Sequence, residues 1–228
     1  MGINYNNSIV TNGLILCLDA ANLRSYPGVG TNWFDISANR THGILTNSPT
    51  YNNEKGGSIV FDGTNDYAVT QATNFTANND FTYEVIIKSD STYLTGRGIL
   101  ANKDYWMTGH GAAISHISNP QTIYGYVTTN TSHYDINSTV GPTYGWTHVI
   151  MRRNNNDLRF FINGQHRGTT KTIYGTITGE SDKFWICSTL NGANTWMGNV
   201  GVVRVYNRSL TQEEILQNFN AIRGRFGL

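Results

Sequence analysis

The chain has 228 residues, a formal net charge of +1 and 14% charged residues, against about 25% in an average domain. Because its basic residues are few and scattered, this composition argues against the clustered basic surface of a nucleic-acid-binding protein, and no apolar run approaches the roughly 18 residues of a membrane span. Abundant Asn, Thr and Ser, 24 Gly and 12% aromatic residues are instead typical of a turn-rich β protein.

The N-terminal residues 1–12 are polar and show no periodicity, which predicts an arm or an irregular first strand. They contain neither the basic region nor the apolar region of a secretory signal. We therefore expect a protein that is made in a cytoplasm and either stays there or is released by lysis. Residues 13–228 show no internal repeat, linker or low-complexity block, and they predict a single domain.

A series of short strands is predicted along the remainder of the chain. Residues 13–19 form a continuous apolar run, which is typical of a strand buried on both faces. Residues 81–88 alternate, with Phe81 and Tyr83 on one face and Glu84 on the other, so we expect a half-buried antiparallel strand. Further strands are predicted at 58–62, 67–69, 98–101, 122–127, 146–152, 158–162, 184–187 and 200–206.

A tight hairpin is predicted where Asn163 and Gly164 lie between an apolar strand and its continuation. This pair is the strongest short hairpin signal, because a type I′ turn needs positive φ at both central residues. Many short strands at steady spacing, without interleaved helices, predict an all-β sandwich or barrel.

One helix is predicted near the end of the chain, at about 212–222. Thr211 is a good N-cap residue and Glu214 follows three positions later, which is the pattern of a capping box. Apolar side chains at helical spacing form one stripe, made of Ile215, Phe219 and Ile222. Gly224 is a natural stop, so we expect a short amphipathic helix packed on the sandwich.

The two cysteines, Cys17 and Cys187, lie in apolar, strand-like runs. This context favours two buried thiols, and a disulfide between an early and a late strand is the alternative. Two lone cysteines do not by themselves make a metal site.

The six histidines are scattered along the chain. We expect His148, which lies in a strand between Trp146 and Ile150, to be a core histidine on an inner face rather than a ligand. His110 and His116 have no acid at metal-binding spacing, and no role is assigned to them.

Four parts of the chain resemble, in the same order, the laminin G-like members of the concanavalin A-like lectin/glucanase superfamily. They are the strand-turn-strand stretch 57–67, the strand 81–85, the hairpin 146–149 with 158–164, and the last strand and helix at 198–215. The resemblance covers roughly 55–225. It implies a two-sheet antiparallel jelly-roll sandwich of the concanavalin A-like type with one short C-terminal helix.

The opening stretch 13–37 resembles a variant common among structural proteins of tailed bacteriophages. This resemblance implies a virion protein, a decoration, fibre or tail-associated module that mediates assembly or weak glycan contact. Its partners would be other virion proteins and a host-surface glycan, with no nucleic acid or membrane, and it would be a homo-oligomer or a repeated copy on the particle. Because fold does not fix function, a cellular carbohydrate-binding or adhesion module is the alternative.

Catalysis is the least favoured function. Retaining glucanases of this superfamily carry acids at alternate positions of one strand, where nucleophile and acid flank a glycosidic bond at about 5 Å. The corresponding strand here offers only Glu84, and Glu180 and Asp182 follow a glycine as turn residues. The sequence has no nucleophile elbow, zinc-protease motif or phosphate loop. We therefore predict a protein that is not an enzyme.

Glycan binding needs exposed aromatic faces together with planar polar side chains that take the sugar hydroxyls. Tyr124 and Tyr126 share a strand face with Thr128, which predicts that this face is wet. The full set of candidates is Tyr105, Trp106, Tyr124, Tyr126, Tyr134, Asp135, Asn194 and Trp196. The alternative is that these side chains pack sheet faces or subunit contacts.

A calcium site is implied by the resemblance, because family members often hold Ca²⁺ at a sheet edge. Asp62, Asn65 and Asp66 form the matching acidic turn. A Ca²⁺ ion takes six or more oxygens, so other groups would have to complete the site. The alternative is that these residues shape the turn through hydrogen bonds from side chain to backbone.

Overall fold

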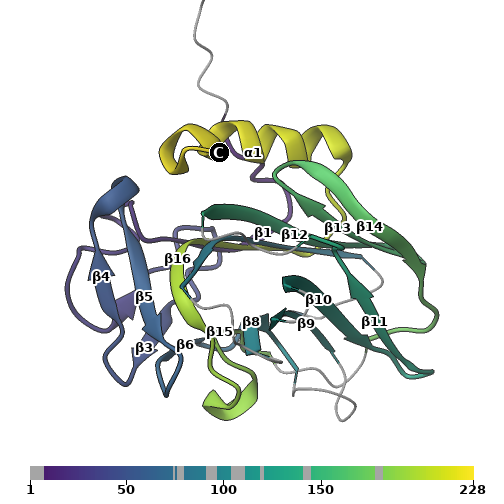
Figure 1. Ribbon diagram of the computed structural model, residues 1–228, viewed down its shortest axis with the longest axis horizontal. Coiled ribbons are helices and arrows are strands. Elements are labelled where there is room, and N and C mark those ends of the chain that lie inside the picture. The colour runs from purple at the N-terminus through teal and green to yellow at the C-terminus, as the bar shows by residue number, and fades with distance from the viewer. Residues whose placement is uncertain are drawn as a thin grey trace, which may run out of the picture.

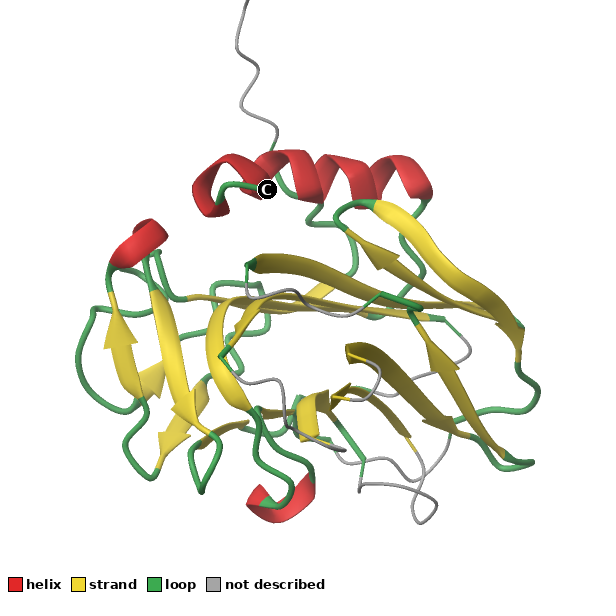
Figure 2. Cartoon of the chain, viewed as in Figure 1, coloured by secondary structure: helices red, strands yellow, loops and turns green. Residues whose placement is uncertain are grey.

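Two antiparallel β-sheets stack face to face, and a C-terminal helix lies across the outer side of one of them (Figure 1). The computed structural model describes residues 8–73, 75, 80–90, 97–103, 111–118, 121–140, 145–177 and 182–228. Figure 2 shows that strands and their connecting loops make up most of the molecule. The prediction of an all-β, two-sheet sandwich with one C-terminal helix is confirmed.

One sheet, here called the helix-covered sheet, contains eight strands. They are β1 (Leu14–Asp19), β4 (Thr50–Asn52), β5 (Ser58–Asp62), β7 (Phe81–Ser89), β12 (Trp146–Asn154), β13 (Asp157–Ile162), β14 (Gln165–Thr172) and β16 (Met197–Tyr206). Their order in space is β14-β13-β12-β7-β16-β5-β4, and β1 also pairs with β16. The early strand β1 and the late strand β16 are therefore neighbours.

The second sheet, here called the open sheet, also contains eight strands. They are β2 (Asn32–Trp33), β3 (Gly43–Thr46), β6 (Tyr67–Thr70), β8 (Arg97–Ala101), β9 (Gly111–Ser118), β10 (Gln121–Thr128), β11 (His133–Asn137) and β15 (Trp185–Ile186). Their order is β11-β10-β9-β8-β15-β6-β3-β2. Two short 3₁₀ turns, at Glu54–Gly56 and Leu190–Gly192, lie in the connections.

The main hydrophobic core fills the space between the two sheets. Alternate residues of β7, including Phe81, Tyr83 and Val85, are fully buried in it, as the sequence pattern predicts. The open sheet contributes Ile123 and Val127 from β10. Each such side chain contributes about 1.5–3 kcal/mol relative to leaving it in water, so this shared layer fixes which face of each strand points inward.

The Asn163-Gly164 hairpin forms as predicted between β13 and β14. Asn163 has a φ of 52° and Gly164 a φ of 76°, the left-handed values that a type I′ turn requires. In addition, the Asn163 side-chain oxygen accepts a 3.0 Å hydrogen bond from the backbone N–H of His148, which ties the turn to β12.

The helix α1 (Gln212–Phe226) begins where the sequence predicts and ends later. The Thr211 hydroxyl accepts from the Glu214 N–H and the Glu214 carboxylate accepts from the Thr211 N–H, which confirms the capping box. The helix passes through Gly224 and stops at Gly227, whose φ is 73°. A glycine inside a helix costs about 1 kcal/mol, and the burial of Phe226 against Trp146, with ring centroids 4.5 Å apart, offsets it.

The outer face of the helix-covered sheet is buried, contrary to the half-buried strand expected for 81–88. Two apolar clusters lie between this face and α1, one around Ile150 and Ile215 and one around Ile86 and Phe226. The outward side of β7, including Glu84, is therefore sealed from water. No helix in the described part of the chain is long and apolar enough to cross a bilayer.

The two cysteines are free and buried, in agreement with the prediction of two thiols rather than a disulfide. Cys17 lies in β1 of the helix-covered sheet and Cys187 follows β15 of the open sheet. Burial raises the pKa of the Cys17 thiol to about 11 and raises the pKa of Cys187 well above its ordinary value. Both side chains are therefore neutral packing residues at physiological pH.

Candidate functional site

The outer face of the open sheet carries a group of predicted glycan-binding residues on β10 and β11. Because the intervening residues of β10 face the core, Tyr124, Tyr126 and Thr128 project from the other side of the sheet. Strand pairing sets Tyr126 opposite Asp135 and Thr128 opposite His133. Cross-strand neighbours on one face lie within contact distance, so the fold brings these five side chains together on one surface.

Three rings on this surface form a stacked row. The Tyr124 and Tyr126 centroids lie 6.2 Å apart at an interplanar angle of 22°, and those of Tyr126 and His133 lie 5.8 Å apart at 20°. Tyr126 is buried in the middle, whereas Tyr124 and His133 at the ends are partly exposed. The row therefore offers ring surface at both ends, held in place by a buried central ring.

Burial and a neighbouring lysine keep the histidine at the end of the row neutral. Lys103 Nζ donates to Thr128 Oγ1 over 2.6 Å, and Thr128 Oγ1 lies 2.9 Å from His133 Nδ1. Burial lowers the pKa of His133 and the nearby Lys103 charge lowers it further, against the opposing effect of Asp135. His133 is therefore neutral near pH 7, with Thr128 as the donor to Nδ1 and an imidazole N–H left on Nε2.

The polar groups beside the rings complement sugar hydroxyls. Asp135 is exposed and presents a carboxylate acceptor next to the Tyr126 and His133 rings, while His133 supplies an N–H donor. Flat rings with a few convergent donors and acceptors are the features that orient a sugar. We call Tyr124, Tyr126, Thr128, His133 and Asp135 the ring face.

The structure assigns structural roles to other predicted glycan-binding residues. Trp196 is fully buried and its Nε1 donates to His116 Nδ1 over 3.4 Å, so it presents no face to a ligand. The hydroxyl of Tyr134 accepts from the Tyr174 N–H at 3.1 Å, and its ring packs on the core side of β11. The side-chain amide of Asn194 donates to Thr189 within its own loop.

Tyr105 and Trp106 lie outside the described residues. Two members of the site were missed by the sequence analysis, namely His133 and the supporting Lys103. The only signal for His133 is the pairing of β10 with β11, and β11 has the mixed sequence His-Tyr-Asp-Ile-Asn, in which only Ile136 is buried. Lys103 follows β8, and the sequence gives no signal of its contact with Thr128.

The acidic turn after β5 is organised by its own backbone. Asp62 Oδ1 accepts from the N–H groups of Thr64 at 2.8 Å, Asn65 at 3.3 Å and Asp66 at 3.3 Å. Desolvation alone would raise the pKa of Asp62, but these hydrogen bonds outweigh it and lower the pKa. Burial, followed by the Asp62 charge, raises the pKa of Asp66.

These three residues on their own leave a Ca²⁺ ion short of oxygen ligands. In the part of the chain that the structure describes, no group of three or more His, Cys, Asp or Glu side chains could hold a metal ion. The turn is thus accounted for by hydrogen bonds, and calcium at Asp62, Asn65 and Asp66 stays a prediction.

A denser group of charges lies between the helix-covered sheet and α1. Glu84 Oε1 accepts from His148 Nε2 at 3.0 Å and from Arg204 Nη1 at 2.7 Å, and its Oε2 accepts from Asn218 Nδ2 at 2.8 Å. Burial alone would raise the pKa of Glu84, but the Arg204 guanidinium and the hydrogen bonds from His148 and Asn218 hold it well below its usual range. We call these four side chains the buried ionic cluster.

The cluster connects the helix-covered sheet, the helix α1 and the N-terminal segment around Val10. Asn218 of α1 accepts a 2.8 Å hydrogen bond from the Val10 N–H, and the Tyr206 hydroxyl donates to the Val10 carbonyl over 3.1 Å. His148 is buried as predicted, but it faces α1 rather than the inner face of the sandwich, and its Nδ1 has no partner among the described residues. The four side chains are at most 3% exposed, so the cluster serves the fold rather than a substrate.

Comparison with known proteins finds a family profile that matches most of the chain. The profile of the family Laminin_G_3, described as "Concanavalin A-like lectin/glucanases superfamily", matches residues 62–216. A stretch of 80 residues is 29% identical to mouse (Mus musculus) usherin and covers 33% of this chain and 2% of usherin. The chain thus spans only a small part of that relative.

Solved structures match over nearly the whole chain at low sequence identity. Domain 4 of AbnA, a GH43 extracellular arabinanase from Geobacillus stearothermophilus in complex with arabinotriose, matches with a TM-score of 0.71 and 16% identity over 92% of this chain and 99% of that one. The binding domain of botulinum neurotoxin DC in complex with SialylT matches with a TM-score of 0.72 and 16% identity, over 93% of this chain and 52% of that one. The binding domain of Paraclostridial mosquitocidal protein 1 matches with a TM-score of 0.71 and 16% identity, over 92% of this chain and 52% of that one. The chain spans about half of each toxin binding domain, and these matches show the fold.

Proposed function

Because this chain belongs to the concanavalin A-like lectin/glucanases superfamily, in its Laminin_G_3 family, we propose that it is a non-enzymatic module that binds glycans through the ring face. The observation that carries the proposal is the stacked row Tyr124–Tyr126–His133 beside the exposed Asp135 carboxylate. Sugar C–H groups pack on aromatic faces, and their hydroxyls pair with carboxylates and imidazole N–H groups. The ring face supplies both.

The neighbours by fold support the ligand class. The arabinanase domain, which this chain covers almost entirely, was solved with arabinotriose, and one toxin binding domain was solved with SialylT. A short oligosaccharide is therefore a reasonable first probe.

The position of Glu84 supports a binding role rather than hydrolysis. Glycoside hydrolysis needs two carboxyl groups about 5–9.5 Å apart that flank the bond. Glu84, the only acid on β7, is fully buried under α1 and engaged by three donors. It lies on the sheet opposite the ring face, so it cannot act on a sugar bound beside Asp135.

The proposal extends to the biological setting, a phage virion protein of the decoration, fibre or tail-associated kind. What supports it is the resemblance of residues 13–37 to structural proteins of tailed phages. On a particle, repeated copies would multiply weak glycan contacts by avidity. Mass spectrometry of purified particles tests this part, since the chain's absence from particles would refute the virion role and leave glycan binding standing.

The glycan proposal is tested by titrating arabinotriose and a panel of neutral oligosaccharides against the wild type and Tyr124→Ala. Because Tyr124 is the partly exposed ring at one end of the row, we expect about a tenfold or larger loss of affinity. Tyr174→Ala is the matched control, since Tyr174 is 58% exposed and lies outside the ring face, and it should leave affinity unchanged. Equal affinity for the wild type and Tyr124→Ala would refute the assignment.

A further inference from the structure

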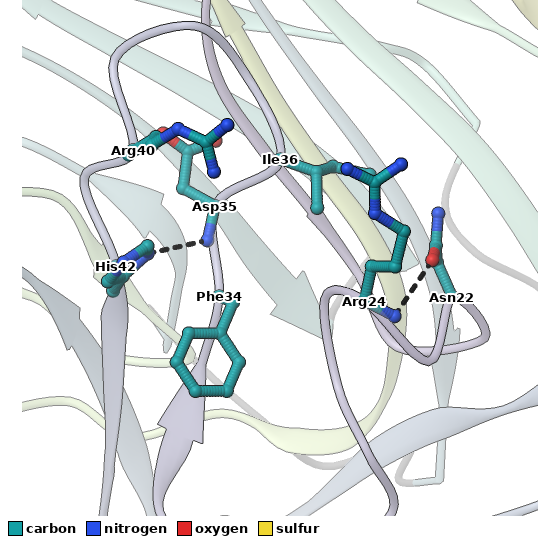
Figure 3. A pocket seen from close by; sticks show the side chains of 7 residues that line it. All are labelled: Asn22, Arg24, Phe34, Asp35, Ile36, Arg40 and His42. Atoms are coloured by element: carbon teal, nitrogen blue, oxygen red, sulfur yellow. Dashed lines mark hydrogen bonds between the residues drawn. The ribbon is translucent and has the colours of Figure 1, made fainter.

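A separate pocket of about 300 Å³ opens at the β2 edge of the open sheet. It is enclosed by the loop that follows β1 and by the segment that joins β2 to β3, and it is lined by Asn22, Arg24, Phe34, Ile36, Arg40 and His42 around Asp35 (Figure 3). The ring face lies on β10 and β11, at the opposite end of the same sheet. The pocket is therefore independent of the proposed function.

A buried carboxylate builds the floor of this pocket. Asp35 is 2% exposed, and its Oδ1 accepts from the N–H groups of Cys17 and Ser37, both at 2.8 Å. Its Oδ2 accepts from Ser37 Oγ at 2.7 Å and from the Thr41 N–H at 2.8 Å. Four donors thus engage the carboxylate, which holds the loop to β1.

Two arginines at the mouth of the pocket carry charge that no described carboxylate pairs with. Arg24 and Arg40 are exposed, and neither guanidinium makes an ion pair or a hydrogen bond with a described residue. Figure 3 shows them reaching over the pocket from two different segments, with Ile36 between them. By contrast, Arg204, Arg208 and Arg225 each bind a carboxylate.

The remaining lining offers one apolar surface and neutral polar groups. The Phe34 ring is partly exposed and is held edge-on by His42, with ring centroids 5.2 Å apart at 78°. His42 Nδ1 accepts the Asp35 N–H over 3.1 Å, so its Nε2 is the nitrogen that carries the proton in the neutral ring. Asn22 Oδ1 accepts the Arg24 N–H at 3.0 Å, which leaves the amide N–H₂ as a donor.

We infer that this pocket binds the carboxylate of an acidic sugar. Guanidinium groups recognise carboxylates by paired, charge-assisted hydrogen bonds, and the Phe34 face with the Asn22 amide suits the ring and a hydroxyl of the same residue. Ligand pockets of this size lie at the low end of about 300–1,000 Å³, so a single terminal sugar fits better than an extended chain. The polar lining favours such a sugar over an apolar peptide side chain.

The test compares acidic oligosaccharides with their carboxyl-reduced forms, which keep the ring and remove only the charge. Titrations use a uronic acid trisaccharide in one arm and a sialylated trisaccharide in the other, against the full chain. We expect at least one acid to bind about tenfold or more tightly than its reduced form, and binding to weaken as salt rises. Which arm responds identifies the source of the carboxylate.

Arg24→Gln and Arg40→Gln should each lower affinity for that acid about tenfold, since each removes a charged hydrogen-bond donor. Arg167→Gln is the matched control, because Arg167 is an exposed arginine on β14 of the other sheet, and it should have no effect. Tyr124→Ala should also leave acid binding intact, which separates this site from the ring face. Circular dichroism and thermal melting confirm that each variant is folded.

Three results would overturn the inference. The first is equal binding of the acid and its reduced form in both arms. The second is unchanged acid binding in both Arg24→Gln and Arg40→Gln. The third, measured with a sulfated neutral sugar as an added ligand, is tighter binding of that sugar than of either acid. None of these results bears on the binding of neutral sugars at the ring face, which is tested separately.

Discussion

The two outer faces of this sandwich start from the same strand pattern and end with opposite properties. On each, alternate residues of a strand face the core, and the residues between them, which include polar and aromatic groups, point outward. On the helix-covered sheet these groups are Glu84, His148 and Arg204, which α1 buries. On the open sheet Tyr124, His133 and Asp135 keep exposed surface.

The difference teaches that alternation identifies the residues that turn away from the core but not the residues that water reaches. On the helix-covered sheet, the helix α1, from the far end of the chain, excludes water from the outer face. Its Asn218 donates to Glu84, and its apolar stripe covers β7, β12 and β16. Polar groups on that face therefore stabilise one arrangement of the fold, whereas Tyr124, His133 and Asp135 on the open sheet keep surface that a ligand can reach.

The largest effect on the free energy of unfolding is expected from a substitution that breaks the buried ionic cluster. Arg204→Met leaves the Glu84 carboxylate buried without its cation, and removing one partner of a buried ion pair costs about 3–5 kcal/mol. Arg159→Met is the matched control, since the Arg159–Asp157 pair is 3.0 Å long but partly exposed, and exposed pairs contribute about 0–1 kcal/mol. Urea unfolding of both variants measures the contrast.

A second substitution sharpens that test. Glu84→Leu added to Arg204→Met removes both charges, so part of the lost stability should return even though His148 and Asn218 lose an acceptor. A double variant that is less stable than Arg204→Met by the full cost of a second independent substitution would show that the two residues are not coupled.

The next effect is the dependence of stability on pH. The pKa of Glu84 is lower in the folded state than the value of about 4.3 in the unfolded chain. Its contribution is therefore fully present above about pH 5 and is lost as pH falls through the unfolded and then the folded pKa. Urea midpoints between pH 7 and pH 3 should fall more steeply for the wild type than for Glu84→Gln, and parallel curves would contradict the role of Glu84.

The site was less predictable than the fold, for reasons that particular residues show. The core face of β7 and the Thr211–Glu214 cap depend on residues close together in sequence, and both predictions are confirmed. The burial of Glu84 depends on a helix about 130 residues later. The row Tyr126–His133 depends on a strand register that the mixed sequence of β11 does not reveal.

Two further differences have the same origin in tertiary packing. The polar neighbours Asn194 and Thr195 favour a loop with an exposed Trp196, but the whole indole is buried in the core between the two sheets. Gly224 is a local stop signal, yet the helix continues because Phe226 gains a buried site against Trp146. In both cases the gain from burying an aromatic ring exceeds a local preference of about 1 kcal/mol.

A smaller effect is expected in the pH dependence of binding at the ring face, if the proposed function holds. Burial and Lys103 lower the pKa of His133, so the neutral ring persists to below the ordinary value of about 6.5. Affinity for a neutral oligosaccharide should be constant from pH 8 to about pH 6.5 and weaken only at lower pH. His133→Gln, which keeps a neutral donor, should flatten the profile, and a transition above pH 7 would contradict this assignment.

The smallest effect concerns the exposed turn at Asp62. Asp62→Ala removes the acceptor of three backbone N–H groups and should cost about 1 kcal/mol, because exposed hydrogen bonds contribute little net stability. If the turn also held Ca²⁺, added calcium would raise the Tm of the wild type and a chelator would lower it. A shift of several degrees that Asp62→Ala abolishes would establish the calcium site, and the same Tm with calcium and with chelator would leave the hydrogen bonds of Asp62 as the whole role of this turn.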